Sequence, residues 1–224
     1  MTRLPLPLRP RLRPRTLRGR LTLGLGAGGS NDEAEGFGLE ARSPGDKIAA
    51  LREAIEIIRG VWAEDYFEYR GEHYHTGGAN IVPKPRRHIP IWIGSYGSRA
   101  VQLTGRLADG WSPSLPYLPL DQAIEAGKVL RRAEAEAGRP PGSVTFNYNV
   151  PIRIGGKARD DRTVAGTPEE IVERLRRFVE AGFTSMSFWP IGDQDEQTAR
   201  LADEILPALR SLPVEHPRER YHGR

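Results

Sequence analysis

The sequence predicts an α/β fold in which the strands of a parallel sheet alternate with helices that cover it. Short apolar runs alternate with amphipathic segments along most of the chain, a pattern typical of βα units. Most helical segments also carry start or stop signals, with serine, threonine or proline at their beginning or glycine at their end. We therefore expect five βα units and one β-hairpin insertion between residues 20 and 212.

The first unit begins with a strand expected over residues 21–26, which runs into the glycine-rich sequence GLGAGG. A polar loop follows, and then a helix is predicted over residues 44–62. Ser43 is the expected N-cap of this helix, Pro44 takes its first position, and Asp46 is expected to close a capping box. Apolar side chains recur three or four residues apart along the helix, so we expect one face of it to pack inward.

A hairpin is predicted where residues 66–82 interrupt the alternation. Aromatic residues flank the turn-forming pair Arg70-Gly71, which favours two antiparallel strands at the rim of the fold over a crossover helix. The second unit then begins with residues 89–94, the continuous apolar run expected of a strand buried on both faces. A helix over residues 98–108 follows at once.

The third and fourth units carry equally clear signals. A short strand is expected at residues 109–112, followed by a helix with Asp121 as its cap and a stop signal at Gly138. Apolar residues then alternate with period two over residues 144–154, as in a long strand. Thr167 begins a second capping box, which starts the helix of the fourth unit.

The fifth unit runs from a strand at residues 184–189 into a closing helix around residues 196–212. Five strands do not close a barrel of eight. The chain is therefore either an open, doubly wound sheet or a barrel that lacks three leading units, and the periodicity alone leaves both possibilities open.

Composition places the chain among globular proteins. Its 224 residues suggest one large domain, and a hydrophobic fraction of 38% leaves no apolar run long enough for a membrane span. Cysteine is absent, which excludes disulfides, thiolate-bound metals, iron–sulfur clusters and a cysteine nucleophile. We therefore expect a cytoplasmic location and no membrane partner.

The first residues differ in composition from the rest of the chain. Residues 1–19 form an arginine- and proline-rich arm that we expect to be disordered, as we expect a flexible tail at residues 213–224. Seven of the 33 lysines and arginines fall within the first 20 residues, so 26 remain against 29 acids in the body. The arm resembles a transit peptide, a polyanion-binding arm or a lead-in from an altered translation start. The acidic body argues against nucleic acid as a specific partner.

The turn after the second strand is the candidate binding site. Backbone amides are free at such a helix start, and the helix dipole favours an anion there. Gly94 and Gly97 allow the backbone to approach a ligand closely, the Ser95 and Ser98 hydroxyls can donate, and Arg99 can add positive charge. A plain tight connection has a similar composition, so these residues alone predict a phosphate site without proving one.

Four stretches of the sequence carry a family resemblance. PKPRRHIPIWIGSYGSRAVQLTGRLADGW, at residues 83–111, resembles the signature stretch of luciferase-like monooxygenases and their deazaflavin-dependent relatives. RLTLGLGAGGSNDEAEGFG at 20–38, YRGEHYHTGGANIVPKP at 69–85 and GTPEEIVERLRRFVEAGFTSMSF at 166–188 support it. The resemblance covers nearly all of residues 20–212. It implies a partial TIM (β/α)₈ barrel of the luciferase-like type, in which the first strand here corresponds to the fourth of the family.

The resemblance also implies a chemistry. The expected function is that of an oxidoreductase or monooxygenase using reduced FMN or the deazaflavin coenzyme F420 on a small organic substrate. The implied cofactor-binding residues are those of the phosphate turn and two at the flavin ring: Gly94, Ser95, Tyr96, Gly97, Ser98 and Arg99, with Gly26 and Ala27 beside the ring. The family draws its catalytic groups from earlier strands that match no position in this sequence, so we assign no catalytic residue.

Other hypotheses remain open at this point. The chain could be a catalytically silent truncated barrel that at most binds cofactor or pairs with another chain, or another TIM-type enzyme with a phosphorylated substrate. Self-association into a homo-oligomer is also left open. His73 and His75 would share one face of a strand but lack a third ligand, so we expect no metal site. Asp109 is expected to be a structural carboxylate that accepts from backbone amides.

Overall fold

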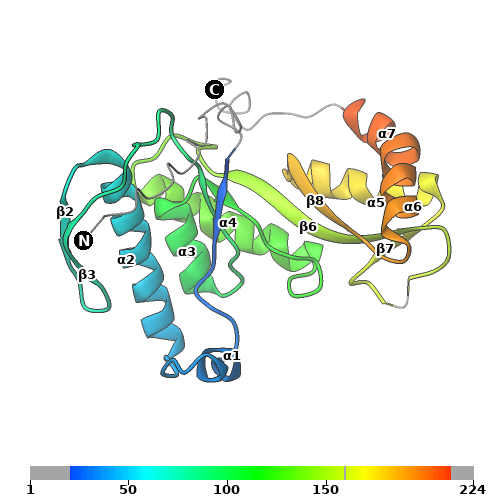
Figure 1. Cartoon of the computed structure of the whole chain (residues 1–224). Coiled ribbons are helices and arrows are strands. Elements are labelled where there is room, and N and C mark those ends of the chain that lie inside the picture. Colours follow the sequence, from blue (N-terminus) through cyan, green and yellow to red (C-terminus); the bar gives the residue numbers. More distant parts are fainter. Residues whose placement is uncertain (1–20, 159, 213–224) are drawn as a thin grey trace, which may run out of the picture.

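The computed structural model describes residues 21–158 and 160–212, and in these ranges six parallel strands form one sheet (Figure 1). The strands of this sheet are β1 (Leu23–Leu25), β4 (Ile91–Ile93), β5 (Gly110–Trp111), β6 (Thr145–Ile154), β7 (Val164–Gly166) and β8 (Ser185–Pro190). They lie in the order β1-β4-β5-β6-β7, and β8 also pairs with β6. A separate antiparallel hairpin consists of β2 (Phe67–Arg70) and β3 (His75–Ala79).

The helices follow the strands as expected of βα units. They are α1 (Asn31–Gly36), α2 (Pro44–Ala63), α3 (Ser98–Leu107), α4 (Leu120–Glu136), α5 (Pro168–Glu180), α6 (Gln194–Arg200) and α7 (Leu206–Arg210). A π-helical turn, Leu201–Ile205, joins the last two. In the part of the chain that the structure describes, no helix combines the length and the apolar character needed to cross a bilayer.

The helices pack on one face of the sheet, and this decides between the two architectures left open by the sequence. Leu23 pairs with Ile91, and both belong to an apolar cluster that includes Leu51 and Ile55 of α2. A doubly wound sheet would carry helices on both faces. Here the order of the strands and the one-sided cover give a parallel half-barrel, in agreement with the predicted partial (β/α)₈ barrel.

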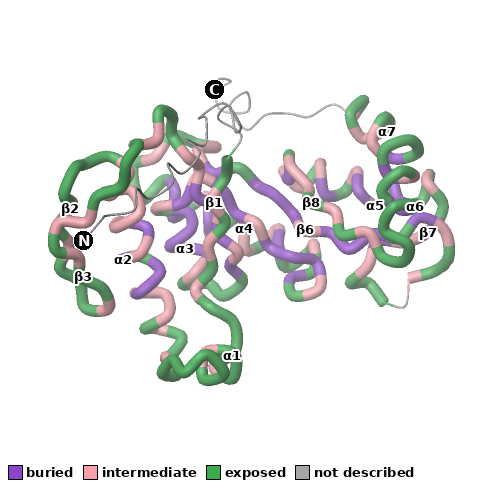
Figure 2. The backbone as a smooth tube through the Cα atoms, viewed as in Figure 1, coloured by how far each residue is buried: buried purple, intermediate pink, exposed green. Residues whose placement is uncertain are grey.

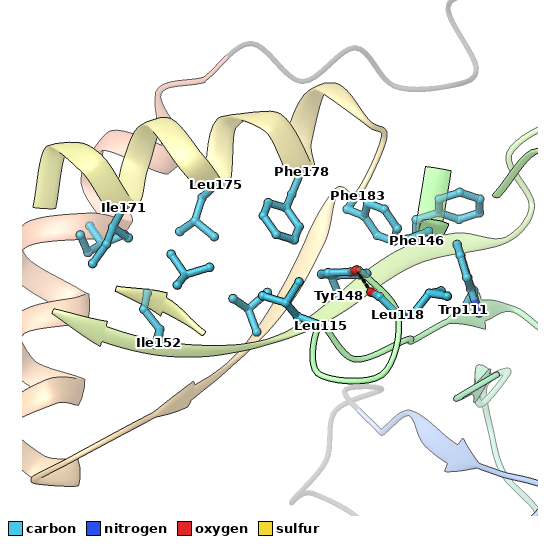
Figure 3. Close-up of a cluster of buried hydrophobic side chains, with 14 of the residues drawn as sticks. Trp111, Leu115, Leu118, Phe146, Tyr148, Ile152, Ile171, Leu175, Phe178 and Phe183 are labelled. Atoms are coloured by element: carbon cyan, nitrogen blue, oxygen red, sulfur yellow. Dashed lines mark hydrogen bonds between the residues drawn. The ribbon is translucent and has the colours of Figure 1, made fainter. Parts of the chain in front are cut away.

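The larger core lies between β5, β6 and the helices α3 to α5 (Figure 3). Tyr148 lies at its centre, with its ring centroid 4.6 Å from that of Phe183 and 5.0 Å from that of Phe178. The Tyr148 hydroxyl donates a hydrogen bond to the carbonyl oxygen of Leu118, and burial raises the pKa of this phenol. Figure 2 shows buried residues concentrated along β6 and α2 to α4, whereas α1 and the hairpin are mostly exposed.

One buried carboxylate attaches the hairpin to α2. The side chain of Glu53, which is 1% exposed, accepts hydrogen bonds of 2.9 Å from the backbone N–H groups of Glu72, His73 and Tyr74. Burial alone would raise the pKa of Glu53, but these donors stabilise the charged form, and the net effect lowers it. The charge of Glu53 therefore fixes the turn of the hairpin.

The predicted strands, the hairpin and the capping box at Thr167 are confirmed. Three local predictions were wrong. The loop after β1 contains the short helix α1, and the loop after β6 contains β7. The N-cap of α4 is Pro119, so Asp121 lies in the first turn instead.

The capping box predicted for α2 also differs in detail. Ser43 accepts from the backbone N–H of Asp46, as expected of an N-cap. The Asp46 carboxylate, however, accepts from the Ser43 hydroxyl at 2.7 Å and does not reach back to the backbone N–H of Ser43, because an aspartate is one methylene shorter than the glutamate of a full box. The predicted arm and tail lie outside the described residues.

Candidate functional site

The face of the sheet opposite the helices is lined by small and polar residues. Side chains alternate between the two faces of a strand, so the apolar residues under the helices leave Gly24, Trp92, Gly110 and Asn147 on the other face. A groove of about 410 Å³ lies on this face at the carboxyl ends of the strands. Its lining consists of Thr22, Gly24, Leu25, Trp92, Gly94, Ser112 and Asn149.

The N-terminus of α3 follows Gly94, a residue of the groove lining, by three positions in the sequence. Gly97 is the N-cap of α3, and no side chain caps that helix. Side-chain caps are present at α1, α2, α5 and α6, on Ser30, Ser43, Thr167 and Asp193. Among the residues that the structure describes, no heavy atom lies within 4 Å of the position that a Cβ would take at Gly97. The first N–H groups of α3 are therefore open to an external acceptor, and the helix dipole favours an anionic one.

The residue Ser95 supports the predicted turn from within. It is 3% exposed, and its hydroxyl lies 2.9 Å from that of Thr104. Because Thr104 donates to the carbonyl oxygen of Ala100, the Ser95 hydroxyl must donate to Thr104. The hydroxyl that we expected to donate to a phosphate therefore donates inside the fold in this structure.

The other residues of the turn are more exposed. Tyr96 lies against Tyr117, with ring centroids 5.7 Å apart, and Ser98 accepts from the side chain of Gln102. Arg99 lines a cavity of about 220 Å³ between α2 and α3, and its guanidinium lies beside Gly45 in the first turn of α2. It therefore points toward the start of a second helix at the same end of the sheet.

The two residues expected at the flavin ring follow β1. Gly26 is exposed, and a Cβ at this position would meet no heavy atom within 4 Å. Ala27 is half-buried, packs against the cluster under β1 and β4, and lines a separate cavity of about 630 Å³ beside α1. Gly26 and Gly94 thus follow paired strands at the same end of the half-barrel.

Two glycines on this face differ in how closely their neighbours approach. The indole of Trp92 crosses Gly110, where a Cβ would come within 2.3 Å of the Trp92 ring. Gly94 faces the backbone of Ser112, whose carbonyl oxygen lies 3.6 Å from a Cβ built at Gly94. The Trp92 indole and the backbone of Gly24 and Gly94 therefore form part of the groove lining.

A polar network that the sequence analysis did not anticipate borders the groove. Asn147 and Asn149 of β6 bond to Ser112, and Asn147 also bonds to Ser185 and Ser187 of β8. The available signal was the pair of asparagines at alternate positions of an otherwise apolar strand. Such a pattern places polar groups together on the face opposite the apolar core.

The sequence also drew attention to the pair His73 and His75 and to Asp109. His73 lies in the hairpin turn, before β3 begins at His75, so the expectation that both share a face of one strand was wrong. The described residues hold no cluster of three or more side chains suited to a metal ion. Asp109 accepts from the backbone N–H of Ile91 at 2.9 Å and from Arg59 at 3.1 Å, which confirms its structural role.

Several known proteins are similar to this chain in sequence. A family model described as luciferase-like monooxygenase matches residues 15–157. The chain belongs to the luciferase-like monooxygenase family. Among relatives, an F420-dependent glucose-6-phosphate dehydrogenase of Gordonia bronchialis is 37% identical, with 88% of this chain and 71% of the relative covered. The corresponding protein of Microbacterium testaceum is 31% identical, with 86% and 69% covered.

Solved structures of other luciferase-like proteins share the fold. An F420-dependent secondary alcohol dehydrogenase in complex with an F420–acetone adduct superposes with a TM-score of 0.75 at 17% identity, covering 86% of this chain and 71% of that one. The coenzyme F420-dependent tetrahydromethanopterin reductase of Methanopyrus kandleri gives a TM-score of 0.71 at 16% identity, with 84% and 74% covered. At these identities the similarity establishes the luciferase-like barrel architecture of the chain.

Proposed function

We propose that this luciferase-like protein is an F420-dependent oxidoreductase, whose cofactor phosphate binds at the start of α3 and whose cofactor ring lies in the groove. The carrying observation is the uncapped N-terminus of α3, whose N-cap Gly97 follows the groove-lining residue Gly94 by three positions. The bound deazaflavin would supply the hydride chemistry, and the protein would supply binding and orientation. The relatives named above are F420-dependent, which favours F420 over FMN.

The residues present fit such a group. Open backbone donors at Gly97 suit a phosphate, and the glycine backbone in the groove lining leaves room for a planar ring. Gly94 lines the groove, and Gly26 follows β1, the strand that pairs with β4 before Gly94. Arg99, placed between the starts of α2 and α3, would add positive charge near the phosphate.

The substrate class is tested by turnover. The chain is mixed with F420 and glucose 6-phosphate, the substrate named for the relatives, and the absorbance of oxidised F420 is followed. A parallel reaction with reduced FMN and oxygen tests the monooxygenase chemistry. Loss of F420 absorbance that depends on the sugar phosphate supports the proposal. Binding of F420 without turnover would favour a silent cofactor-binding half-barrel, and binding of neither cofactor would overturn the proposal.

The small-molecule substrate, a cytoplasmic location and self-association belong to the same proposal. Measurement of the solution mass by light scattering tests self-association, and fractionation of the native host tests location.

A further inference from the structure

The amide orientations in the network beside the groove are determined by one backbone carbonyl. The Asn149 side chain places one atom 3.1 Å from the carbonyl oxygen of Ser112, and a carbonyl oxygen only accepts. That atom is therefore Nδ2. The Asn149 Oδ1 must then face Asn147, at 3.4 Å, so the Asn147 atom on that side is its amide nitrogen.

These orientations determine where the Ser112 hydroxyl can donate. Asn147 Nδ2 donates to Ser112 Oγ at 2.8 Å, and Asn149 Nδ2 donates to the same oxygen at 3.1 Å. Asn149 Nδ2 shares its two protons among the carbonyl oxygen of Ser112, Ser112 Oγ and Ser114 Oγ, and neither amide nitrogen beside Ser112 Oγ can accept the hydroxyl proton. The proton of the Ser112 hydroxyl must therefore point in a third direction. Within residues 21–158 and 160–212, the hydrogen bonds of this hydroxyl are those that it accepts from the two amide nitrogens.

The groove is where that proton can find an acceptor. Ser112 is half-buried and lines the groove together with Trp92, Gly24 and Gly94. Its position is well fixed, because Asn147 is 1% exposed and is itself held by the hydroxyl of Ser185 at 2.9 Å. The described residues that line the groove include no charged side chain, so a neutral acceptor fits better than an anion.

We propose that Ser112 donates a hydrogen bond to a carbonyl oxygen of a planar heteroaromatic ring bound in the groove, and that Asn147 and Asn149 are positioning residues that aim this donor. The glycine backbone and the Trp92 indole in the groove lining would accept such a ring. The inference rests on the proposed function, because the rings of both F420 and FMN carry carbonyl oxygens. It adds a specific contact on the ring, separate from the phosphate contact at Gly97.

The test is a fluorescence titration of F420, FMN and riboflavin into the full chain and two serine variants. Ser112→Ala removes the donor. Ser114→Ala is the matched control, because the Ser114 hydroxyl also accepts from Asn149 Nδ2, at 3.2 Å, yet does not line the groove. Riboflavin carries the ring without the phosphate, so it reports on the groove alone. Thermal unfolding of each variant is measured in parallel.

We expect Ser112→Ala to weaken binding of whichever ring binds by about 2-fold to about 10-fold, the range for one neutral hydrogen bond. The factor should be the same for FMN and riboflavin, and the absorption band of the bound ring should shift. Ser114→Ala should leave the affinity unchanged. If Ser112→Ala fails to fold, Ser112→Cys provides a weaker donor of similar size. We expect Ser112→Cys to bind the ring compounds more weakly than the wild type does, because a thiol is a weaker donor than a hydroxyl.

Equal binding by Ser112→Ala and wild type would overturn the assignment of Ser112, while leaving the proposed function intact. Equal losses in Ser112→Ala and Ser114→Ala would also overturn it, since the network would then be only structural. A wild-type chain that binds none of the three compounds would overturn the proposed function, and with it this inference.

Discussion

The indole N–H of Trp111 donates to the carbonyl oxygen of Ser95 at 3.0 Å, and this bond ties the proposed phosphate turn to the main core. Trp111 is fully buried, and its ring centroid lies 5.1 Å from that of Phe146. The conformation of the turn therefore depends on packing beneath the sheet. The position of Gly97 at the start of α3 is fixed from inside the protein, two residues after Ser95.

Trp111→Phe should remove this bond together with part of the packing of the buried indole. We expect the free energy of unfolding to fall by about 1–3 kcal/mol, because a buried carbonyl loses its partner. We also expect weaker binding of F420, because the turn is less well held. Chemical denaturation and cofactor titration measure the two effects. Trp62→Phe on α2 is the control, because Trp62 is remote from the turn in sequence and does not make this bond. We expect this variant to keep the cofactor affinity of the wild type. An equal loss of affinity in Trp62→Phe would contradict the role of Trp111.

Glu53→Gln should release the hairpin from α2. Glutamine can accept through only one oxygen and directs an N–H group toward backbone donors, so the melting temperature should fall at neutral pH. Because the pKa of Glu53 is lowered in the folded state, its stabilising effect is complete above the ordinary value of 4.5. The effect is lost as the pH falls through the lowered value, so the two melting curves should converge in acid.

The matched control for this pH series is Glu56→Gln on the same helix. Glu56 is more exposed and bonds to the Tyr69 hydroxyl and to Arg52, so its replacement should have a smaller effect on the melting temperature. A constant difference between wild type and Glu53→Gln from neutral to acid pH would show that the charge of Glu53 does not stabilise the turn.

Gly105→Ala should weaken the contact between α3 and α4. A Cβ at Gly105 would lie 2.4 Å from the carbonyl oxygen of Leu130, and backbone there cannot move aside cheaply. We expect a loss of about 1–3 kcal/mol in the free energy of unfolding. Gly45→Ala on α2 is the control, because its Cβ would make ordinary contact at 3.6 Å with Ser43 and should be neutral or slightly stabilising. Equal stability of both variants would contradict the close packing.

Local signals in the sequence predict much of this fold. Capping residues such as Ser43 and Thr167 predict helix starts because their side chains satisfy backbone donors that no other local group can reach. The helix α4 begins with Pro119 as its N-cap and has no side-chain cap. Asp121 is the nearest residue of a type that caps helices, so the sequence predicts the N-cap two residues too late. The strand β7 has three residues and forms only because β6 extends beside it, so no local pattern could predict it.

The candidate site was only partly predictable. The glycines at 94 and 97 are visible as a turn, but the inward direction of the Ser95 hydroxyl depends on Thr104, nine residues away on the next helix. The Ser112 network depends on β5, β6 and β8 being adjacent, a long-range property. Sequence periodicity shows which residues share a face of a strand, whereas the partners across that face follow from strand order.

The most direct test of the proposed site is a fluorescence titration of F420 into the wild type and Gly97→Asp, with Gly97→Asn as control. Aspartate suits the extended N-cap conformation at this position, with φ of −75°, so the fold should be as stable as before or more stable by a few tenths of a kcal/mol. The same carboxylate would occupy the first N–H groups of α3 and repel a phosphate. We predict that Gly97→Asp binds F420 at least about 10-fold more weakly than the wild type does, and also more weakly than Gly97→Asn does. The melting temperature of Gly97→Asp should not fall. An unchanged affinity in a folded Gly97→Asp protein would contradict the claim that the start of α3 holds the cofactor phosphate.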